Sequence, residues 1–154
     1  MELESIKILE NLGIEYDLIE LSGRSVTVDD VVKNAEKDID SDEVCKTIVV
    51  KGVDEGDFFG VILKGIDEID FSVLEDILDQ EVETASLDEL RELTGKDPGE
   101  ISPVSLDLPL LIDEKVFESV KINFGSGDPS YGLEIFSEDL KKLDNKKLLN
   151  LSKD

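Results

Sequence analysis

Histidine is absent from the 154-residue sequence, and Cys45 is the only cysteine. These absences exclude zinc sites built from Cys and His, Ser-His-Asp or Cys-His catalysis, and an intramolecular disulfide. We therefore expect neither a metal nor another cofactor. Any chemistry must come from lysine, carboxylates, hydroxyl groups, the backbone or the substrate itself.

Basic residues are few: 16 Lys and Arg face 39 Asp and Glu, which gives a formal net charge of −23. Because 40% of the residues are hydrophobic, the chain is nonetheless expected to fold. Its length predicts a single domain over residues 1–154. The acidic excess argues against DNA and against any broad nucleic-acid surface, because attraction to phosphate normally supplies the non-specific affinity.

Long hydrophobic runs are also missing, since no stretch reaches the roughly 18 apolar residues that a membrane-spanning helix needs. The first segment, MELESIKILENLG, is charged throughout and lacks the cationic start and apolar core of a signal peptide. These features predict a cytoplasmic protein with no membrane partner.

The hydrophobic pattern predicts a mixture of helices and strands. Strands are expected over residues 14–21, 44–51, 57–64, 81–84, 110–112, 120–124 and 132–136, the second and third forming a hairpin. Helices are expected over residues 2–12 and 27–37, after Asp70, from Ser86 to Gly95, and from Ser137 through Leu148. Residues 96–109 are rich in Pro, Gly, Ser and Asp and predict a loop.

Lys46 is the most informative single residue. In a strand, alternation places Lys46 on the same face as Val44, Ile48 and Val50, so a cation lies in an apolar row. One interpretation is a sheet edge, where the lysine stem packs and its ammonium reaches water. The other is a cleft in which the ammonium recognises an anion or a carbonyl.

Several other sequence features have both a structural and a functional interpretation. Gly99 and Pro103 bound a Gly-x-x-x-Pro loop that predicts either a surface turn or backbone donors for a ligand, and residues 125–127 predict either a turn or an anion-binding nest. Cys45 is predicted to be core packing, because an apolar strand raises a thiol pKa. Five lysines near the C-terminus either balance nearby acids or contact tRNA or another partner: Lys141, Lys142, Lys146, Lys147 and Lys153.

Taken together, these motifs resemble the YbaK/ProX family of aminoacyl-tRNA deacylases, which are similar to the editing domain of prolyl-tRNA synthetase. The resemblance is carried by residues 43–50 (EVCKTIVV), 94–103 (TGKDPGEISP), 132–135 (GLEI) and 138–140 (EDL). It extends over nearly the whole chain, and the order and spacing of the motifs are more specific than any one of them.

The resemblance implies an α/β (α+β) fold, a compact domain with a curved mixed β-sheet flanked by helices. It implies catalytic roles for Lys46 and Gly99, with Lys46 matching the essential lysine of the family. The remaining implied site residues bind substrate: Thr47, Glu100, Ile101, Ser102, Pro103, Ser126 and Glu134. No metal site is implied.

The implied activity is trans-editing, the hydrolysis of the ester of a mischarged tRNA, with Cys-tRNA(Pro) or Ala-tRNA(Pro) as the expected substrate. The implied partner is the 3′ end of that tRNA, and the charge of −23 suggests help from prolyl-tRNA synthetase or an elongation factor. The alternative is a non-catalytic module of the same fold that senses an amino acid or docks on a synthetase.

Two positions depart from the family pattern. Where relatives carry a short turn with a serine and a basic residue, this chain has the longer and acidic segment 124–132, so the serine's role passes to Ser126 or is lost. Glu134 stands where the family commonly has Asp. The altered turn favours the non-catalytic alternative, whereas the retained Lys46 and Gly-x-x-x-Pro loop favour the enzyme.

Overall fold

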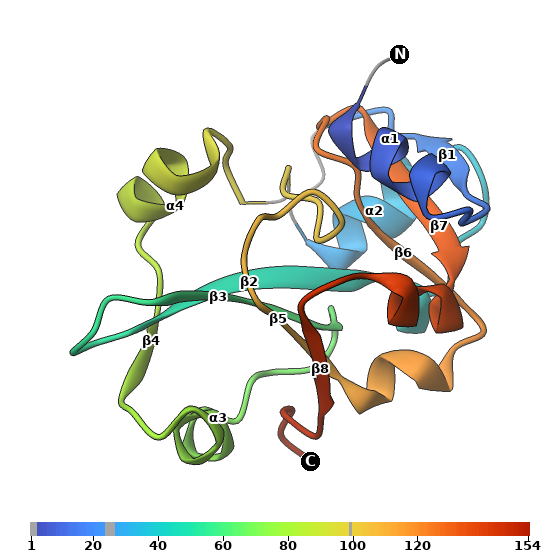
Figure 1. The fold of residues 1–154 in the computed structure, drawn as a ribbon. Helices are drawn as coiled ribbons and strands as arrows, with labels where there is room; N and C mark the ends of the chain where they lie inside the picture. The colour runs from blue at the N-terminus through green and yellow to red at the C-terminus, as the bar shows by residue number, and fades with distance from the viewer. Residues whose placement is uncertain (1–2, 24–26, 99) are drawn as a thin grey trace.

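The computed structural model describes residues 3–23, 27–98 and 100–154, which fold into a mixed α/β arrangement around two sheets (Figure 1). The helices are α1 (Glu4–Asn11), α2 (Val28–Asn34), α3 (Phe71–Leu78) and α4 (Leu87–Thr94), with 3-10 helices η1 (Ser41–Glu43), η2 (Glu114–Glu118) and η3 (Ser137–Lys142). The strands are β1 (Asp17–Glu20), β2 (Cys45–Gly52), β3 (Phe58–Lys64), β4 (Val82–Thr84), β5 (Leu110–Asp113), β6 (Lys121–Gly125), β7 (Tyr131–Phe136) and β8 (Lys146–Leu149).

The smaller sheet has the antiparallel order β1-β7-β6, and the larger has the mixed order β4-β2-β3-β5-β8. In the larger sheet, β2 and β3 form the predicted hairpin, whereas β5 and β8 join as parallel strands. A bridge between Val44 and Asn123 connects the two sheets. The expected α/β fold is confirmed, with its strands divided between two sheets.

Side-chain caps fix the starts of three helices where the sequence predicted them. Thr27 and Ser86 each accept from the backbone N–H three residues later, and each forms a capping box. Asp70 accepts from the Val73 N–H at 3.3 Å. The helix α4 ends before Gly95, whose φ of +73° is a left-handed conformation that glycine adopts at little cost.

The predicted helix from Ser137 through Leu148 is wrong. Only the short η3 forms, and the chain then enters β8, parallel to β5. Asn145 has a φ of +56°, which interrupts the helix, and its carbonyl accepts from the Leu110 N–H at 2.9 Å. Leu140 and Leu143 are buried, but their spacing of three fits a 3-10 helix as well as an α-helix. Pairing with β5 therefore overrides the helical pattern.

The two largest apolar clusters lie against the sheets. The larger joins α1 to both sheets and includes Leu9, Ile62 and Leu133, all fully buried. The second places Leu74 of α3 and Leu151 of the C-terminal segment against the larger sheet (Figure 1). Within the described part of the chain, no helix is long and apolar enough to cross a membrane.

Candidate functional site

A cavity of about 400 Å³ lies where the two sheets meet under α2. One wall is aliphatic and consists of Ile19, Val28, Val31, Ile39 and Val44. The opposite parts of the lining come from β2, the loop after α4 and the turn between β6 and β7. A volume of this size suits a small organic ligand.

Lys46 lines this cavity from β2, together with Thr47. The side chain is partly buried, and its Nζ donates a hydrogen bond to the Gly65 carbonyl oxygen at 3.2 Å. Among the described residues of the lining, Lys46 is the one cation and Asp128 the one carboxylate. The structure thus places Lys46 in a cleft, one of the two positions that the sequence allowed.

Gly65 brings α2 close to the lysine. A Cβ atom at this position would collide with Cγ2 of Val28 and lie 3.2 Å from the Val44 carbonyl oxygen. The Gly65 N–H also donates to that Val44 oxygen at 2.7 Å. Glycine is therefore required here by the close approach of α2, and its carbonyl is left to hold Lys46.

The loop that follows α4 reaches the cavity in part. Pro98 and Ile101 line it, whereas Gly99, a predicted catalytic residue, lies outside the described residues. The Glu100 N–H donates to the Asp97 carbonyl at 3.1 Å, so this donor is used within the loop. Lys96 donates to the Gly127 carbonyl at 2.7 Å and ties the loop to the turn between β6 and β7.

The end of the same loop faces elsewhere. Ser102 and Pro103 are buried, and Ser102 lines a neighbouring cavity of about 300 Å³ with Thr94 and Leu106. The Ser102 hydroxyl finds no hydrogen-bond partner within the described residues. Substrate binding by Glu100, Ser102 and Pro103 stays a prediction, because none of the three lines the main cavity.

Ser126 shapes the turn between β6 and β7. Its Oγ donates to the Tyr131 carbonyl oxygen at 2.7 Å and accepts from the Asp128 N–H at 3.1 Å. The Ser126 carbonyl accepts from the hydroxyl of Ser5 in α1. Ser126 does not contribute to the cavity lining, but Gly125 and Asp128 on either side of it do. A role for Ser126 in substrate binding stays a prediction.

Glu134 lies in β7 outside the cavity and lines a separate, more open pocket. It is 6% exposed, and its Oε1 accepts a hydrogen bond from Lys37 Nζ at 2.7 Å. This hydrogen bond raises the pKa of Lys37 above its ordinary value. The substrate-binding role of Glu134 stays a prediction.

Cys45 also lines the cavity, but its thiol is not prepared for nucleophilic attack. Burial raises the pKa of Cys45 to about 12, so the thiol stays protonated at neutral pH. Its side chain packs in the larger core. This agrees with the packing role predicted from the sequence.

Asn123 in β6 is a cavity residue that the sequence analysis missed. It is 3% exposed and stands between the buried Ile122 and Phe124. Its Oδ1 and Nδ2 find no hydrogen-bond partner within the described part of the chain. The available signal was a polar amide between the apolar Ile122 and Phe124 of a predicted strand.

Three of the five C-terminal lysines pair with acids. Lys141 lies 2.6 Å from Glu138, and Lys142 lies 3.1 Å from Asp139. Lys153 lies 3.6 Å from Glu68. These contacts agree with the interpretation in which the lysines balance nearby acidic residues.

Comparison with known proteins decides the family. Residues 24–143 match the profile of the aminoacyl-tRNA editing domain. The chain belongs to the aminoacyl-tRNA editing domain family. This confirms the resemblance that the motifs around Lys46 and Gly99 indicated.

Solved structures share the fold of this editing domain at low sequence identity. A hypothetical protein has a TM-score of 0.88 at 21% identity, with 97% of this chain and 100% of that chain covered. A protein described as a candidate trans-editing enzyme for prolyl-tRNA synthetase has a TM-score of 0.83 at 20% identity, with both chains fully covered. A protein described as a candidate signal transduction protein from Marinobacter aquaeolei VT8 has a TM-score of 0.70 at 17% identity, with 97% of this chain and 31% of that chain covered.

Proposed function

We propose that this editing domain is a trans-acting deacylase that hydrolyses the ester between a mischarged amino acid and the terminal ribose of tRNA. The proposed substrate is Cys-tRNA(Pro) or Ala-tRNA(Pro). The observation that carries the proposal is the position of Lys46, a cation on the wall of a largely aliphatic cavity. Membership of the editing family supports the reaction class, and a cavity of about 400 Å³ supports a small aminoacyl group.

The reaction requires water to attack the ester carbonyl, after which the carbon–oxygen bond to the ribose breaks. The ribose oxygen takes a proton, and the products are a free amino acid and a tRNA with a free terminal hydroxyl. Lys46 Nζ donates a hydrogen bond to the Gly65 carbonyl oxygen in this structure. In the proposed reaction, the same ammonium donates to the ester carbonyl or to the terminal nucleotide. Such a donor stabilises negative charge that develops on the carbonyl oxygen.

The substrate itself is the best source of a group that assists the attacking water. The Cys45 thiol is held protonated, and histidine is absent from the chain. The neighbouring hydroxyl of the terminal ribose lies next to the ester in every aminoacyl-tRNA and can position the water. The protein then contributes orientation and exclusion of bulk solvent, both of which lower the barrier.

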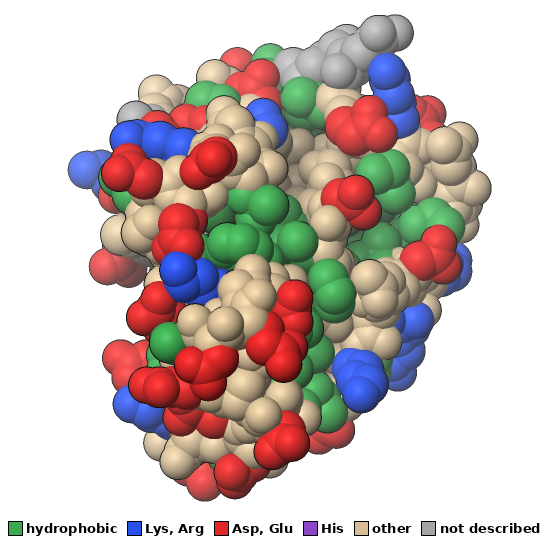
Figure 2. All heavy atoms as spheres, turned by 60° about the vertical axis from the view of Figure 1, so that its left-hand side comes forward, with side chains coloured by type: hydrophobic (Ala, Val, Ile, Leu, Met, Phe, Trp, Pro, Cys, Tyr) green, Lys and Arg blue, Asp and Glu red, His purple; other side chains and the backbone are tan. Residues whose placement is uncertain are grey.

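Delivery of the tRNA calls for a partner. Figure 2 shows Asp and Glu side chains distributed over one face of the molecule, with Lys and Arg in smaller groups. With a net charge of −23, the chain repels phosphate. We therefore infer that prolyl-tRNA synthetase or an elongation factor presents the acylated 3′ end, in the cytoplasm.

The test is release of labelled amino acid from tRNA(Pro) charged in turn with Cys, Ala and Pro. Lys46→Ala is expected to lower kcat/KM by about 10²–10³-fold on the hydrolysed species, the usual cost of removing a donor to a developing oxyanion. Lys51→Ala is the matched control, because Lys51 lies on the same strand but pairs with Glu89 at 2.5 Å. It should leave the rate unchanged.

Two results would contradict the proposal. Hydrolysis that persists in Lys46→Ala would show that Lys46 takes no part in the reaction. No hydrolysis of any of the three substrates, even with prolyl-tRNA synthetase added, would favour a module of the same fold that binds an amino acid or docks on a synthetase.

A further inference from the structure

Asn123 is a buried polar side chain for which the mechanism above has no use. Asn123 is a lining residue of the cavity and is 3% exposed, and both polar atoms of its amide are buried without a hydrogen-bond partner among the described residues. A buried amide left without partners destabilises the folded chain. A cost of this kind is typical of a group that a ligand completes.

The backbone holds this amide in place. Asn123 lies opposite Glu134 in the β6–β7 ladder, and it also forms the bridge to Val44 that joins the two sheets. Two backbone neighbours therefore fix its position from different sides. These two pairings fix the backbone from which the amide projects.

The surroundings of the amide are apolar on one side. Val44, its bridge partner, packs in the aliphatic cluster with Ile19 and Ile39, all of which line the same cavity. Lys46 enters the cavity from β2, two residues along the chain from Val44. A substrate whose ester carbonyl contacts Lys46 would then extend its amino-acid side chain along this aliphatic wall towards Asn123.

We propose that Asn123 recognises the side chain of the aminoacyl group and selects a small amino acid with a hydroxyl or thiol on Cβ, such as serine or cysteine, over alanine. This inference rests on the proposed function. The amide offers one acceptor and one donor group, and a hydroxyl or thiol can pair with both. The methyl group of alanine pairs with neither and leaves the buried amide unsatisfied.

The expected selectivity is substantial. A site with a buried hydrogen-bonding group discriminates strongly against an analogue that lacks the matching group, because its own polar atoms are then left unpaired. We expect seryl or cysteinyl esters to exceed the alanyl ester by about 10- to 100-fold in kcat/KM. Serine should show the larger preference, since a thiol is the weaker hydrogen-bonding group.

The first experiment measures kcat/KM for tRNA(Pro) carrying Ser, Cys or Ala, with the wild type and with Asn123→Leu. Leucine has a similar size but offers no hydrogen bond, so the preference for Ser and Cys should disappear and the three kcat/KM values should become about equal. Asn150→Leu, at an exposed position, is the control and should keep the wild-type preference. An equal loss for all three esters would overturn the inference, because it would assign Asn123 to the α-ammonium or the ribose, which all three share.

The second experiment measures binding without turnover. The probes are adenosines in which a seryl or alanyl group is joined to the ribose through an amide, which resists hydrolysis. Wild-type protein should bind the seryl probe about 10-fold or more tightly than the alanyl probe, and Asn123→Leu should bind both alike. Equal binding of the two probes by the wild type overturns the inference, whatever the variant does.

These readouts separate the two proposals. Hydrolysis of an ester with no side-chain preference would retain the deacylase and reject the role of Asn123. Preferential binding of the seryl probe without hydrolysis of any ester would retain the role of Asn123 and reject the deacylase.

Discussion

Asp113 and Asn123 are both buried polar residues on strands, at 0% and 3% exposure. They differ in whether their side chains have hydrogen-bond partners. Asp113 ends β5 and accepts three hydrogen bonds from the C-terminal segment, from the Leu151 N–H at 2.8 Å, the Ser152 N–H at 3.2 Å and the Ser152 hydroxyl at 3.0 Å. Asn123 has no such partner within the described residues.

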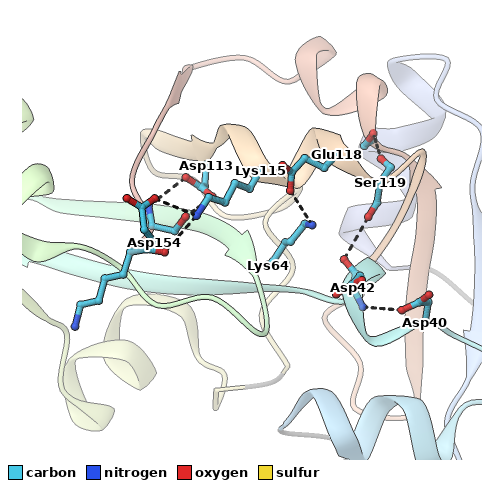
Figure 3. Close-up of polar contacts among 11 residues, drawn as sticks. Asp40, Asp42, Lys64, Asp113, Lys115, Glu118, Ser119 and Asp154 are labelled. Atoms are coloured by element: carbon cyan, nitrogen blue, oxygen red, sulfur yellow. Dashed lines mark hydrogen bonds and ion pairs between the residues drawn. The ribbon is translucent and has the colours of Figure 1, made fainter.

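Figure 3 shows Asp113 together with further paired polar groups, on η2 and on the elements near it. Lys64 Nζ bonds Glu118 Oε1 at 3.1 Å, and Ser119 donates to the Asp42 carbonyl at 3.3 Å. Burial is the largest single influence and lowers the pKa of Lys64, but the hydrogen bond to Glu118 and the negative charges of Glu118, Asp42 and Asp67 together raise the pKa overall. Polar groups in this region hold the fold together, whereas the unpaired amide lies where a ligand would complete it.

The largest effect that tests this comparison is expected for Asp113→Ala. It removes an acceptor shared by three donors, two of them in backbone that is buried at Leu151 and Ser152. We expect a loss of about 3 kcal/mol in the free energy of unfolding, measured by urea denaturation. Glu114→Ala, at the exposed neighbouring position, should change it by less than about 0.5 kcal/mol. A small effect for Asp113→Ala would show that its contacts do not secure the C-terminal segment.

A smaller effect is expected at the wall of the cavity. Gly65→Ala forces a methyl group against Val28 of α2 and should lower the free energy of unfolding by about 1–3 kcal/mol. The Gly65 carbonyl accepts the hydrogen bond of Lys46, so a shift of Gly65 should also displace the lysine. We therefore expect kcat/KM to fall by about tenfold.

Val28→Ala supplies the control for that prediction. It removes the methyl group in conflict, so the double variant should recover much of the stability that Gly65→Ala loses. A double-mutant cycle measures this coupling directly. Additive losses would show that the close approach of α2 to Gly65 is unimportant.

Local signals in the sequence predicted much of this structure. The capping residues Thr27 and Ser86 marked helix starts because their hydrogen bonds involve neighbours only three residues away. The β2–β3 hairpin was predictable for the same reason, as its alternating apolar residues flank a short polar turn. Lys46 was found because a cation in an apolar row needs an explanation.

The failures arose where distant segments decide the outcome. The strand β8 forms because its backbone pairs with β5, which lies more than 30 residues earlier. No local sequence pattern predicts that pairing. Asn123 was missed because its importance depends on the junction with Val44, which the sequence does not display. The hydrogen bonds of the Ser126 hydroxyl to backbone atoms of its own turn were likewise not predictable, and its substrate-binding role stays a prediction.

The smallest expected effect has the opposite sign from the others. Asn123→Leu exchanges an unpaired buried amide for an apolar side chain of similar size, so the free energy of unfolding should rise by about 1 kcal/mol. Urea denaturation beside Asp113→Ala places both buried polar groups on one scale. Loss of stability in Asn123→Leu would mean that the amide supports the fold, as Asp113 does. A gain in stability together with lost side-chain selectivity would show that the amide is kept for the ligand at the expense of the fold.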